Sequence, residues 1–283
     1  MRILILGGDG MLGHQLLKSF SSKYEVKVTL RRDLVAYDHY MLFDDTNAYP
    51  GVDVGSLERI ADVLADFRPQ AVINAVGIVK QRETANEIVP TLKINSLFPH
   101  RLAKLCKIAD ARLLHMSTDC VFSGKKGNYH EADLSDAEDF YGKTKFLGEV
   151  YDSHCLTFRT SIIGRELSRK SGLLEWFIAQ TGTVKGFKNA IFTGFTTLEM
   201  SRIIEDVLQN HPKAFGVYHV SSDPISKYDL LLLFQKKFRH DVRIVPEETF
   251  RCDRSLDSSR FRREFGYTPP TWEEMIEELS TQT

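Results

Sequence analysis

Three side chains in this sequence have the types and spacing that acid chemistry at a carbonyl group requires. Tyr141 and Lys145 lie four positions apart in "YGKTK", and Thr118 lies earlier, in "STDCVFSG". A spacing of four places two side chains on one face of a helix. A phenol can give a proton to an oxygen that gains negative charge, and a hydroxyl can hold that oxygen in place. We therefore expect these residues to protonate a ketone as it accepts a hydride.

The lysine is expected to adjust the acidity of the tyrosine. A free phenol has a pKa of about 10, and a nearby ammonium favours the tyrosinate and lowers that value. A pKa of about 7, where a general acid works best, needs about 4 kcal/mol of electrostatic interaction. We expect Lys145 to supply it and to reach the ribose hydroxyls of a nicotinamide cofactor. In the alternative interpretation, Tyr141 packs on its helix and Lys145 is a surface residue.

The stretch "LILGGDGMLG", residues 4–13, is rich in glycine directly after an aliphatic run. Gly7, Gly10 and Gly13 stand three residues apart, with Met11 and Leu12 between the last two. Glycines where a first strand passes to a first helix allow a tight turn and close approach of the backbone to a pyrophosphate, which binds the free amides at the start of the helix. The stretch predicts a dinucleotide site, and a purely structural turn is the alternative.

Arg31 and Arg32 follow the second expected strand, in "TLRRD". At that position an acidic residue holds a free ribose 2′-hydroxyl, whereas an arginine holds a 2′-phosphate. A guanidinium presents several donors, which suits a phosphate. The two arginines predict NADPH (NADP) as the cofactor in preference to NADH, while Asp33 beside them is the residue that would favour NADH.

Short aliphatic runs alternate with helical patterns through the first part of the chain. Strands are expected at residues 2–8, 24–32, 70–77, 111–119 and 155–161, and helices at 11–20, 56–67, 95–109 and 140–151. Such alternation is typical of βαβ units around a parallel sheet. We predict an α/β fold with a Rossmann-type doubly wound parallel sheet. "STDCVFSG" then lies at the carboxyl edge of the sheet, where such folds bind their ligands.

The regular alternation fades after about residue 162. Helices are expected at 172–180, 197–208, 227–238 and 271–279, and strands at 216–222 and 241–245. We predict that residues 1–161 form an NADP(H)-binding Rossmann domain and that residues 162–283 form mainly a smaller α+β substrate-binding domain. Some segments of the second part are expected to return to the Rossmann sheet.

Composition excludes several classes of partner. A net charge of −1 offers no basic surface for nucleic acid or for an acidic membrane. No run reaches the roughly 18 apolar residues of a membrane span. The four cysteines form no C-x-x-C pair and no secretory leader precedes them, so we expect reduced thiols in a cytoplasmic protein. His14, His100 and His115 have no ligand partners at metal spacing, and no metal is expected.

Several stretches, in this order, resemble the dTDP-4-dehydrorhamnose reductase family of extended short-chain dehydrogenases: "GGDGMLG", "NAVG", "INSLFPHRLAKLC", "STDCVFSG", "YGKTKFLGE", "RTSIIGRE", "GVYHVSS" and "RSLDSSRFRREFGYTPPTW". They cover nearly the whole chain. The resemblance implies a Rossmann domain with a small C-terminal substrate domain. It also implies NADPH-dependent reduction of the C4 ketone of a 4-keto-6-deoxy nucleotide sugar, in deoxysugar biosynthesis for cell-surface polysaccharide, and it allows a homodimer.

The resemblance also assigns residues, position by position. It places the catalytic Thr, Tyr and Lys at Thr118, Tyr141 and Lys145. The implied cofactor-binding residues are Gly7, Gly10, Met11, Leu12, Gly13, Arg31, Arg32, Asp53, Val54, Ala75, Val76, Gly77, Asn95, Tyr141 and Lys145. The expected substrate-binding residues are Thr118, Asp119, Cys120, Val121, Arg159, Ser161, Ile162, Arg165 and Arg251. Of these, Arg165 and Arg251 are the candidates for holding the substrate diphosphate.

Two departures leave the sugar open. Ile162 stands where the family often has tryptophan, and Cys120 stands where it often has tyrosine. A UDP-linked 2-acetamido sugar is therefore an alternative to dTDP-4-dehydrorhamnose. A dehydratase is disfavoured because Asp119 is not followed by a second acid. A nucleotide-sugar epimerase remains open, as does a regulatory subunit that holds NADP(H) without turnover.

Overall fold

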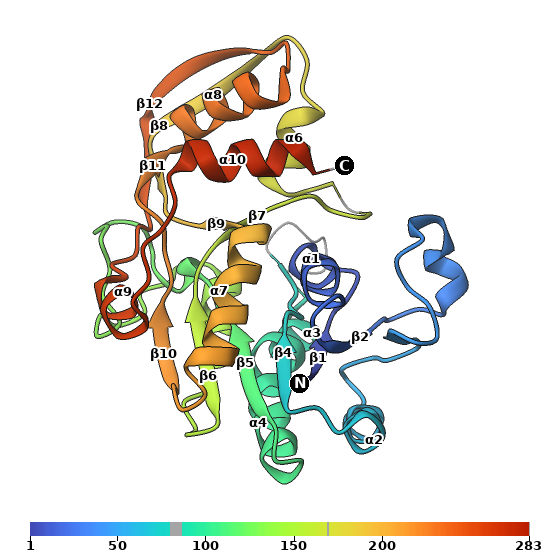
Figure 1. Ribbon diagram of the computed structural model, residues 1–283. Helices are drawn as coiled ribbons and strands as arrows, with labels where there is room; N and C mark the ends of the chain where they lie inside the picture. Colours follow the sequence, from blue (N-terminus) through green and yellow to red (C-terminus); the bar gives the residue numbers. More distant parts are fainter. Residues whose placement is uncertain (80–86, 169, 283) are drawn as a thin grey trace.

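The computed structural model describes residues 1–79, 87–168 and 170–282. Within these ranges the main feature is a seven-stranded parallel sheet with the order β10-β6-β5-β4-β1-β2-β3 (Figure 1). Its strands are β1 (Arg2–Leu6), β2 (Glu25–Thr29), β3 (Ala48–Tyr49), β4 (Ala71–Asn74), β5 (Arg112–Met116), β6 (Cys155–Arg159) and β10 (Gly216–His219). The order reverses between β1 and β4, which is the point where such folds bind dinucleotides.

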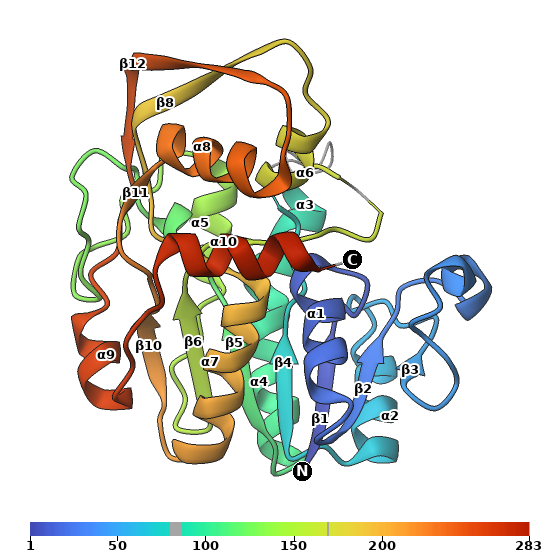
Figure 2. The same cartoon turned by 45° about the horizontal axis from the view of Figure 1, so that its top comes forward.

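The aliphatic strands are buried because helices cover both faces of the sheet. Ile3 and Ile5 of β1 point into one core with helices α1 (Met11–Phe20) and α7 (Thr197–Asn210), whereas Leu4 and Leu6 point into the other. That second core includes α2 (Leu57–Phe67) and α4 (Phe98–Ile108). Figure 2 shows α1 and α7 on the near side of the sheet and α4 behind it. The predicted doubly wound Rossmann-type fold is confirmed.

The remaining helices shape the edge of the sheet and the C-terminal part. They are α3 (Ile88–Thr91), the π-helix η3 (Leu92–Leu97), α5 (Phe140–Leu147), α6 (Leu173–Ile178), α8 (Lys227–Phe238), α9 (Ser259–Phe265), α10 (Trp272–Thr281), and the 3₁₀ segments η1 (Leu34–Tyr40) and η4 (Asp119–Val121). In the described ranges, no helix has the length and apolar character that crossing a membrane requires.

Most of the second part of the chain gathers above the carboxyl edge of the large sheet (Figure 1). Its strands are β7 (Ile162–Ile163), β8 (Thr183–Phe192), β9 (Phe195–Thr196), β11 (Ile225–Ser226) and β12 (Arg243–Asp253). The two long strands, β8 and β12, form a sheet with β11 in the order β11-β8-β12, against which α8 packs. In contrast, β10 pairs with β6 and α7 packs on α1, so these segments belong to the Rossmann layers. The division at residue 161 stays a prediction.

Candidate active site

Thr118 and Tyr141 meet where β5 ends and α5 begins. Thr118 caps η4, because its hydroxyl accepts a hydrogen bond from the Cys120 amide at 3.1 Å. Asp139 caps α5 by accepting from the Gly142 amide at 2.7 Å. A Cβ atom at Gly142 would lie 2.1 Å from the Cys120 carbonyl oxygen, so only glycine permits this approach. The close packing brings the Tyr141 phenol into hydrogen-bond contact with the Thr118 side chain.

Lys145 lies one turn further along α5 and is almost fully buried. Its Nζ donates to the Met116 carbonyl at the end of β5, at 2.7 Å. Burial lowers the pKa of Lys145 to about 8, and the Glu149 carboxylate opposes that fall. The structure thus brings Thr118, Tyr141 and Lys145 together at one edge of the sheet, in the arrangement that the sequence predicted.

The structure contradicts the lowered pKa that the sequence predicted for Tyr141. Burial raises the pKa of Tyr141 above its ordinary value, with a further rise from Cys120, while the Thr118 hydrogen bond works in the opposite direction. The ammonium of Lys145 is directed at the Met116 carbonyl instead of neutralising a tyrosinate. Tyr141 is therefore a protonated phenol at neutral pH, which is the form that a proton donor needs.

The Thr118 hydroxyl is already hydrogen-bonded within the site. It donates to Oδ1 of Asp119 at 3.1 Å, and both residues are buried. To bind a ketone oxygen, the hydroxyl has to rotate away from this carboxylate. Asp119 therefore orients the hydroxyl of Thr118, and its predicted contact with substrate stays a prediction.

The glycine stretch has the geometry of an anion cradle. Gly7 has a φ of +86°, which disfavours other residues, and a Cβ atom at Gly13 would lie only 2.0 Å from the Gly7 carbonyl oxygen. Gly10 precedes α1 and offers no side-chain cap, so the first amides of the helix, at Met11 and Leu12, are not capped by a side chain. These residues fit the pyrophosphate of a dinucleotide.

Arg31 and Arg32 are exposed directly after β2. In the described ranges neither side chain has a hydrogen bond or an ion pair, which leaves both free to bind a phosphate. The Arg32 amide donates to the Tyr37 hydroxyl at 3.4 Å, and that hydroxyl donates to Asp9 of the glycine stretch at 3.2 Å. This link fixes the end of β2 beside the cradle.

The predicted adenine side lies at the start of α2. The carboxylate of Asp53 accepts from the Gly55 amide at 2.8 Å. Val54 is buried and lines a cavity of about 130 Å³ together with Lys93 and Arg101. A cavity of this size, between the start of α2 and the helical segment η3–α4, is compatible with part of an adenine ring.

Asn95 lies in the π-helix, and its amide group is fully used. Its Oδ1 accepts from the Ile78 amide at 2.8 Å, and its Nδ2 donates to the Ile78 carbonyl at 2.9 Å and to the Thr144 hydroxyl at 3.3 Å. These bonds hold the loop of Ala75, Val76 and Gly77 against α5. We conclude that Asn95 supports the cofactor site by fixing this loop, since its polar atoms all face protein groups.

Arg159 does not fit the predicted contact with substrate. Its Nε and Nη2 donate to the two oxygens of Glu149 at 2.8 Å each, and Nη1 lies 3.2 Å from Nε2 of His219. The side chain is only 4% exposed. Because the guanidinium is held in this buried ion pair, the prediction that Arg159 binds the substrate is wrong.

Of the predicted substrate residues beside Thr118 and Arg159, Val121 differs from the prediction, whereas Ser161 and Ile162 are compatible with it. Val121 is fully buried with Phe122 and Tyr129, so its predicted contact with substrate is wrong. Ser161 and Ile162 are half-buried where β6 leads to β7, and the Ser161 carbonyl accepts from the Phe195 amide at 2.9 Å. Their place at the end of β6 remains consistent with a sugar contact.

Arg165 and Arg251 stay the predicted ligands of the substrate diphosphate, and a third arginine, Arg254, contacts Cys120. Arg165 pairs with Glu175 at 3.3 Å, and Arg251 is exposed on β12 without a hydrogen bond or ion pair to any described residue. Arg254, which the sequence analysis did not single out, reaches the site. Its Nε donates to the Phe122 carbonyl at 2.8 Å and its Nη1 lies 3.6 Å from the Cys120 thiol.

Arg254 also lies 3.9 Å from Asp139, the residue that caps the helix of Tyr141. Its side chain is 23% exposed, so part of the guanidinium remains available to a ligand. The only sequence signal for it was its place at the start of "RSLD", inside the resemblance.

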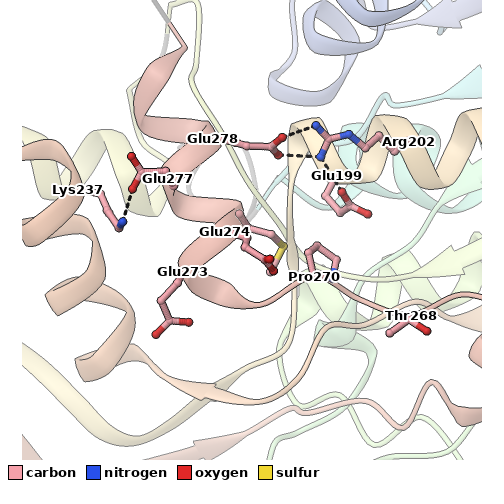
Figure 3. Close-up of a pocket in the computed structure, with 10 residues that line it drawn as sticks. Glu199, Arg202, Lys237, Thr268, Pro270, Glu273, Glu274, Glu277 and Glu278 are labelled. Carbon is pink, nitrogen blue, oxygen red and sulfur yellow. Dashed lines mark hydrogen bonds and ion pairs between the residues drawn. The ribbon is translucent and has the colours of Figure 1, made fainter.

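A separate groove of about 810 Å³ lies between α7, α8 and α10 (Figure 3). Its wall carries five carboxylates: Glu199, Glu273, Glu274, Glu277 and Glu278. Arg202 pairs with Glu278 and Lys237 pairs with Glu277, so the groove keeps an excess of negative charge. A dinucleotide or a nucleotide sugar is itself anionic, and this groove would repel both. None of the residues that line it is one of the three catalytic candidates.

Comparison with known proteins shows the family to which the chain belongs. The family model for the RmlD substrate binding domain matches residues 1–283. The chain belongs to the RmlD family. Among RmlD relatives, the dTDP-4-dehydrorhamnose reductase of Aggregatibacter actinomycetemcomitans is 23% identical over 98% of both chains. The predicted family is therefore confirmed.

Solved structures agree with the RmlD fold. A hypothetical dTDP-4-dehydrorhamnose reductase from Sulfolobus tokodaii is 28% identical, with a TM-score of 0.75 over 93% of this chain and 94% of its own. The dTDP-4-dehydrorhamnose reductase of Bacillus anthracis, solved in complex with NADP, is 19% identical, with a TM-score of 0.79 over 98% of both chains. The names of these relatives agree with the predicted class of enzyme, an oxidoreductase, and with the predicted cofactor.

Proposed function

We propose that this protein is an NADPH-dependent reductase that converts the C4 ketone of a 4-keto-6-deoxy nucleotide sugar to an alcohol, in the biosynthesis of deoxysugars for cell-surface polysaccharide. The observation that carries the proposal is the group of Thr118, Tyr141 and Lys145 beside the glycine cradle of a Rossmann sheet. Membership of the RmlD family and the names of the relatives support the same reaction.

The residues divide the work of the reaction. When bound, NADPH supplies the hydride that adds to the ketone carbon. The Tyr141 phenol gives its proton to the ketone oxygen, which becomes the new hydroxyl, and the tyrosinate that remains is stabilised by the ammonium of Lys145. Lys145 keeps donors for the ribose hydroxyls beyond its bond to the Met116 carbonyl. Thr118 turns its hydroxyl from Asp119 to the ketone oxygen and fixes that oxygen in place.

The cofactor is held along the carboxyl edge of the sheet. Gly7, Gly10 and Gly13 with the start of α1 take the pyrophosphate, and the free guanidinium groups of Arg31 and Arg32 take the 2′-phosphate. Asp53 and Val54 contact the adenosine. The loop of Ala75, Val76 and Gly77, fixed by Asn95, supports the ribose beside Lys145.

The sugar lies between Thr118, Cys120, Ser161 and Ile162, and Arg254 binds the anionic part of the substrate. A half-buried guanidinium with free donors is well suited to a diphosphate oxygen. Deoxythymidine and uridine are both candidate nucleosides, and a 2-acetamido sugar fits the smaller side chains at positions 120 and 162. We further propose that the enzyme acts in the cytoplasm. We also propose that it is a homodimer, and light scattering of the purified protein would test this oligomeric state.

The test is turnover by purified protein with NADPH and a panel of dTDP- and UDP-linked 4-keto-6-deoxy sugars, followed by loss of the reduced-nicotinamide absorbance. We expect oxidation of NADPH with at least one sugar and a product that carries a C4 hydroxyl. Tight binding of NADPH without turnover of any sugar would instead identify a regulatory subunit. Conversion of the sugar without net oxidation of NADPH would identify an epimerase.

A further inference from the structure

Glu149 stands at the end of "YGKTKFLGE" and takes no part in the proposed proton transfer. Its carboxylate is completely buried and lies four residues after Lys145, just beyond the end of α5. It accepts four hydrogen bonds: two from Arg159 at 2.8 Å each, one from the Ser117 hydroxyl at 2.8 Å, and one from the Tyr151 hydroxyl at 3.1 Å. A buried carboxylate with this many donors is held as an anion in a fixed position.

The partners of Glu149 connect it to both halves of the catalytic group. Ser117 directly precedes Thr118, so the bond from Ser117 ties the end of β5 to the end of α5. Arg159 ends β6, and its Nη1 lies against His219 of β10. The ring of His219 in turn lies 2.9 Å from the Tyr129 carbonyl, in the loop after β5. Three neighbouring strand ends are therefore fixed around one carboxylate.

Glu149 is also the negative charge that acts on Lys145. The titratable groups around the catalytic pair are Tyr141 and Glu149 on either side of Lys145, His115 on β5, Asp119 in η4 and Arg159 on β6. His115 is completely buried, and burial holds its pKa well below the usual range, so it is neutral. Burial alone favours the loss of a proton from Lys145, and the carboxylate of Glu149 opposes that loss.

We propose that Glu149 is a positioning residue for the catalytic pair: its carboxylate ties the Thr118 end of β5 to the helix of Lys145 and places a buried negative charge four residues beyond Lys145. Arg159 binds both oxygens of this carboxylate and so fixes it where it accepts from Ser117 and acts on Lys145. This role rests on the proposed reduction, because proton donation by Tyr141 is the step that needs the ammonium.

The charge is tested with Glu149→Gln, which leaves Arg159 without a counter-ion, and with the double variant Glu149→Leu and Arg159→Met, which removes both buried charges and folds more readily. The readout is the dependence of kcat/KM for the sugar on pH at saturating NADPH. Activity should fall as pH rises through the pKa of Lys145. Loss of the carboxylate should move this alkaline limb to lower pH by about one unit, because the loss of a nearby negative charge disfavours the ammonium form.

The matched control is Glu278→Gln, the same chemical change in an ion pair of the remote acidic groove, which should leave the profile unmoved. Ser117→Ala tests the tie without altering charge: kcat should fall several-fold while the alkaline limb stays in place. An alkaline limb that does not move in either Glu149 variant overturns the proposed effect on charge. An unchanged kcat in Ser117→Ala overturns the proposed tie.

A readout without substrate separates this inference from the proposed function. Side-chain carbon NMR of carbon-13-labelled lysine, with Lys145 assigned through Lys145→Met, reports the titration of Lys145 directly. The pKa of Lys145 should fall in Glu149→Gln even if no sugar is turned over, and it should fall less in the double variant, because the positive charge of Arg159 is lost together with the carboxylate. An unchanged titration would contradict the role of Glu149 whatever reaction the enzyme performs.

Discussion

Lys145 and Arg159 are both buried cations at the carboxyl edge of the same sheet, yet their surroundings are opposite. Arg159 is bound by both oxygens of Glu149 and lies against His219. Among the described residues, Lys145 has a single acceptor, the Met116 carbonyl, and no carboxylate in direct contact. A fully paired cation supports the structure, whereas one with unused donors is available to a ligand. A positive charge and a place at the carboxyl edge of the sheet do not distinguish these cases; the number of hydrogen bonds does.

The largest effect on stability should come from breaking the buried ion pair between Arg159 and Glu149. Arg159→Met leaves the Glu149 carboxylate buried without its counter-ion, and we expect a loss of about 3–5 kcal/mol in the free energy of unfolding. Denaturant unfolding measures it. Arg254→Met, at a half-buried arginine without a close ion pair, is the control and should cost about 1 kcal/mol or less. Similar losses in both variants would show that the ion pair of Arg159 with Glu149 contributes no more to the free energy of unfolding than the contacts of Arg254 do.

Substitution of exposed arginines without a described ion partner should change the affinity for the cofactor and leave stability unchanged. Arg31→Ala combined with Arg32→Ala removes two exposed cations that have no ion pair with any residue the structure describes, so folding should be unaffected. We expect the affinity for NADPH to fall about 10- to 100-fold, and the affinity for NADH to change by a few-fold at most. Fluorescence titration of the two cofactors measures both. Equal losses for NADPH and NADH would contradict the assignment of the 2′-phosphate to these residues.

A smaller effect should separate the arginines of the C-terminal part. Arg254→Ala should raise KM for the nucleotide sugar about tenfold and leave the affinity for NADPH unchanged, because its guanidinium lies beside Cys120 on the substrate side. Arg251→Ala, on the exposed strand β12, is the matched control and should leave KM unchanged. The reverse outcome, a raised KM with Arg251→Ala alone, would restore the interpretation drawn from the sequence.

The sequence predicted the Rossmann part well because each signal there is local. The helix expected at 11–20 forms over those residues, and the expected strands coincide with β1, β2, β4, β5 and β6 apart from their ends. The ten-residue strand β8 was missed, because "TVKGFKNAIF" lacks regular alternation and its partner β12 is distant in the sequence. The π-helix at Asn95 was read as ordinary helix, since one extra residue in a turn leaves no pattern in a short segment.

Prediction of the site was least successful for side chains whose partners lie on other strands and loops. Thr118, Tyr141 and Lys145 come together as the motif predicted, whereas their catalytic roles stay a prediction. Arg159 was assigned to substrate because nothing in "RTSIIGRE" indicates that Glu149 lies opposite. Arg254 was missed because nothing in the sequence shows that the residue directly after β12 contacts the Phe122 carbonyl and Cys120. In each case the missing information is which side chain faces which neighbour, and that comes from tertiary packing.

The central claim is that Tyr141 is the proton donor of a reductase, and Tyr141→Phe tests it most directly. The substitution removes the phenol hydroxyl and keeps the ring that packs beside Cys120. On the sugar that the wild-type protein reduces, kcat should fall about 100-fold or more, with NADPH binding and the free energy of unfolding nearly unchanged. Turnover within a few-fold of the wild type would contradict the account, and proton donation would then have to be assigned to Thr118 or to water.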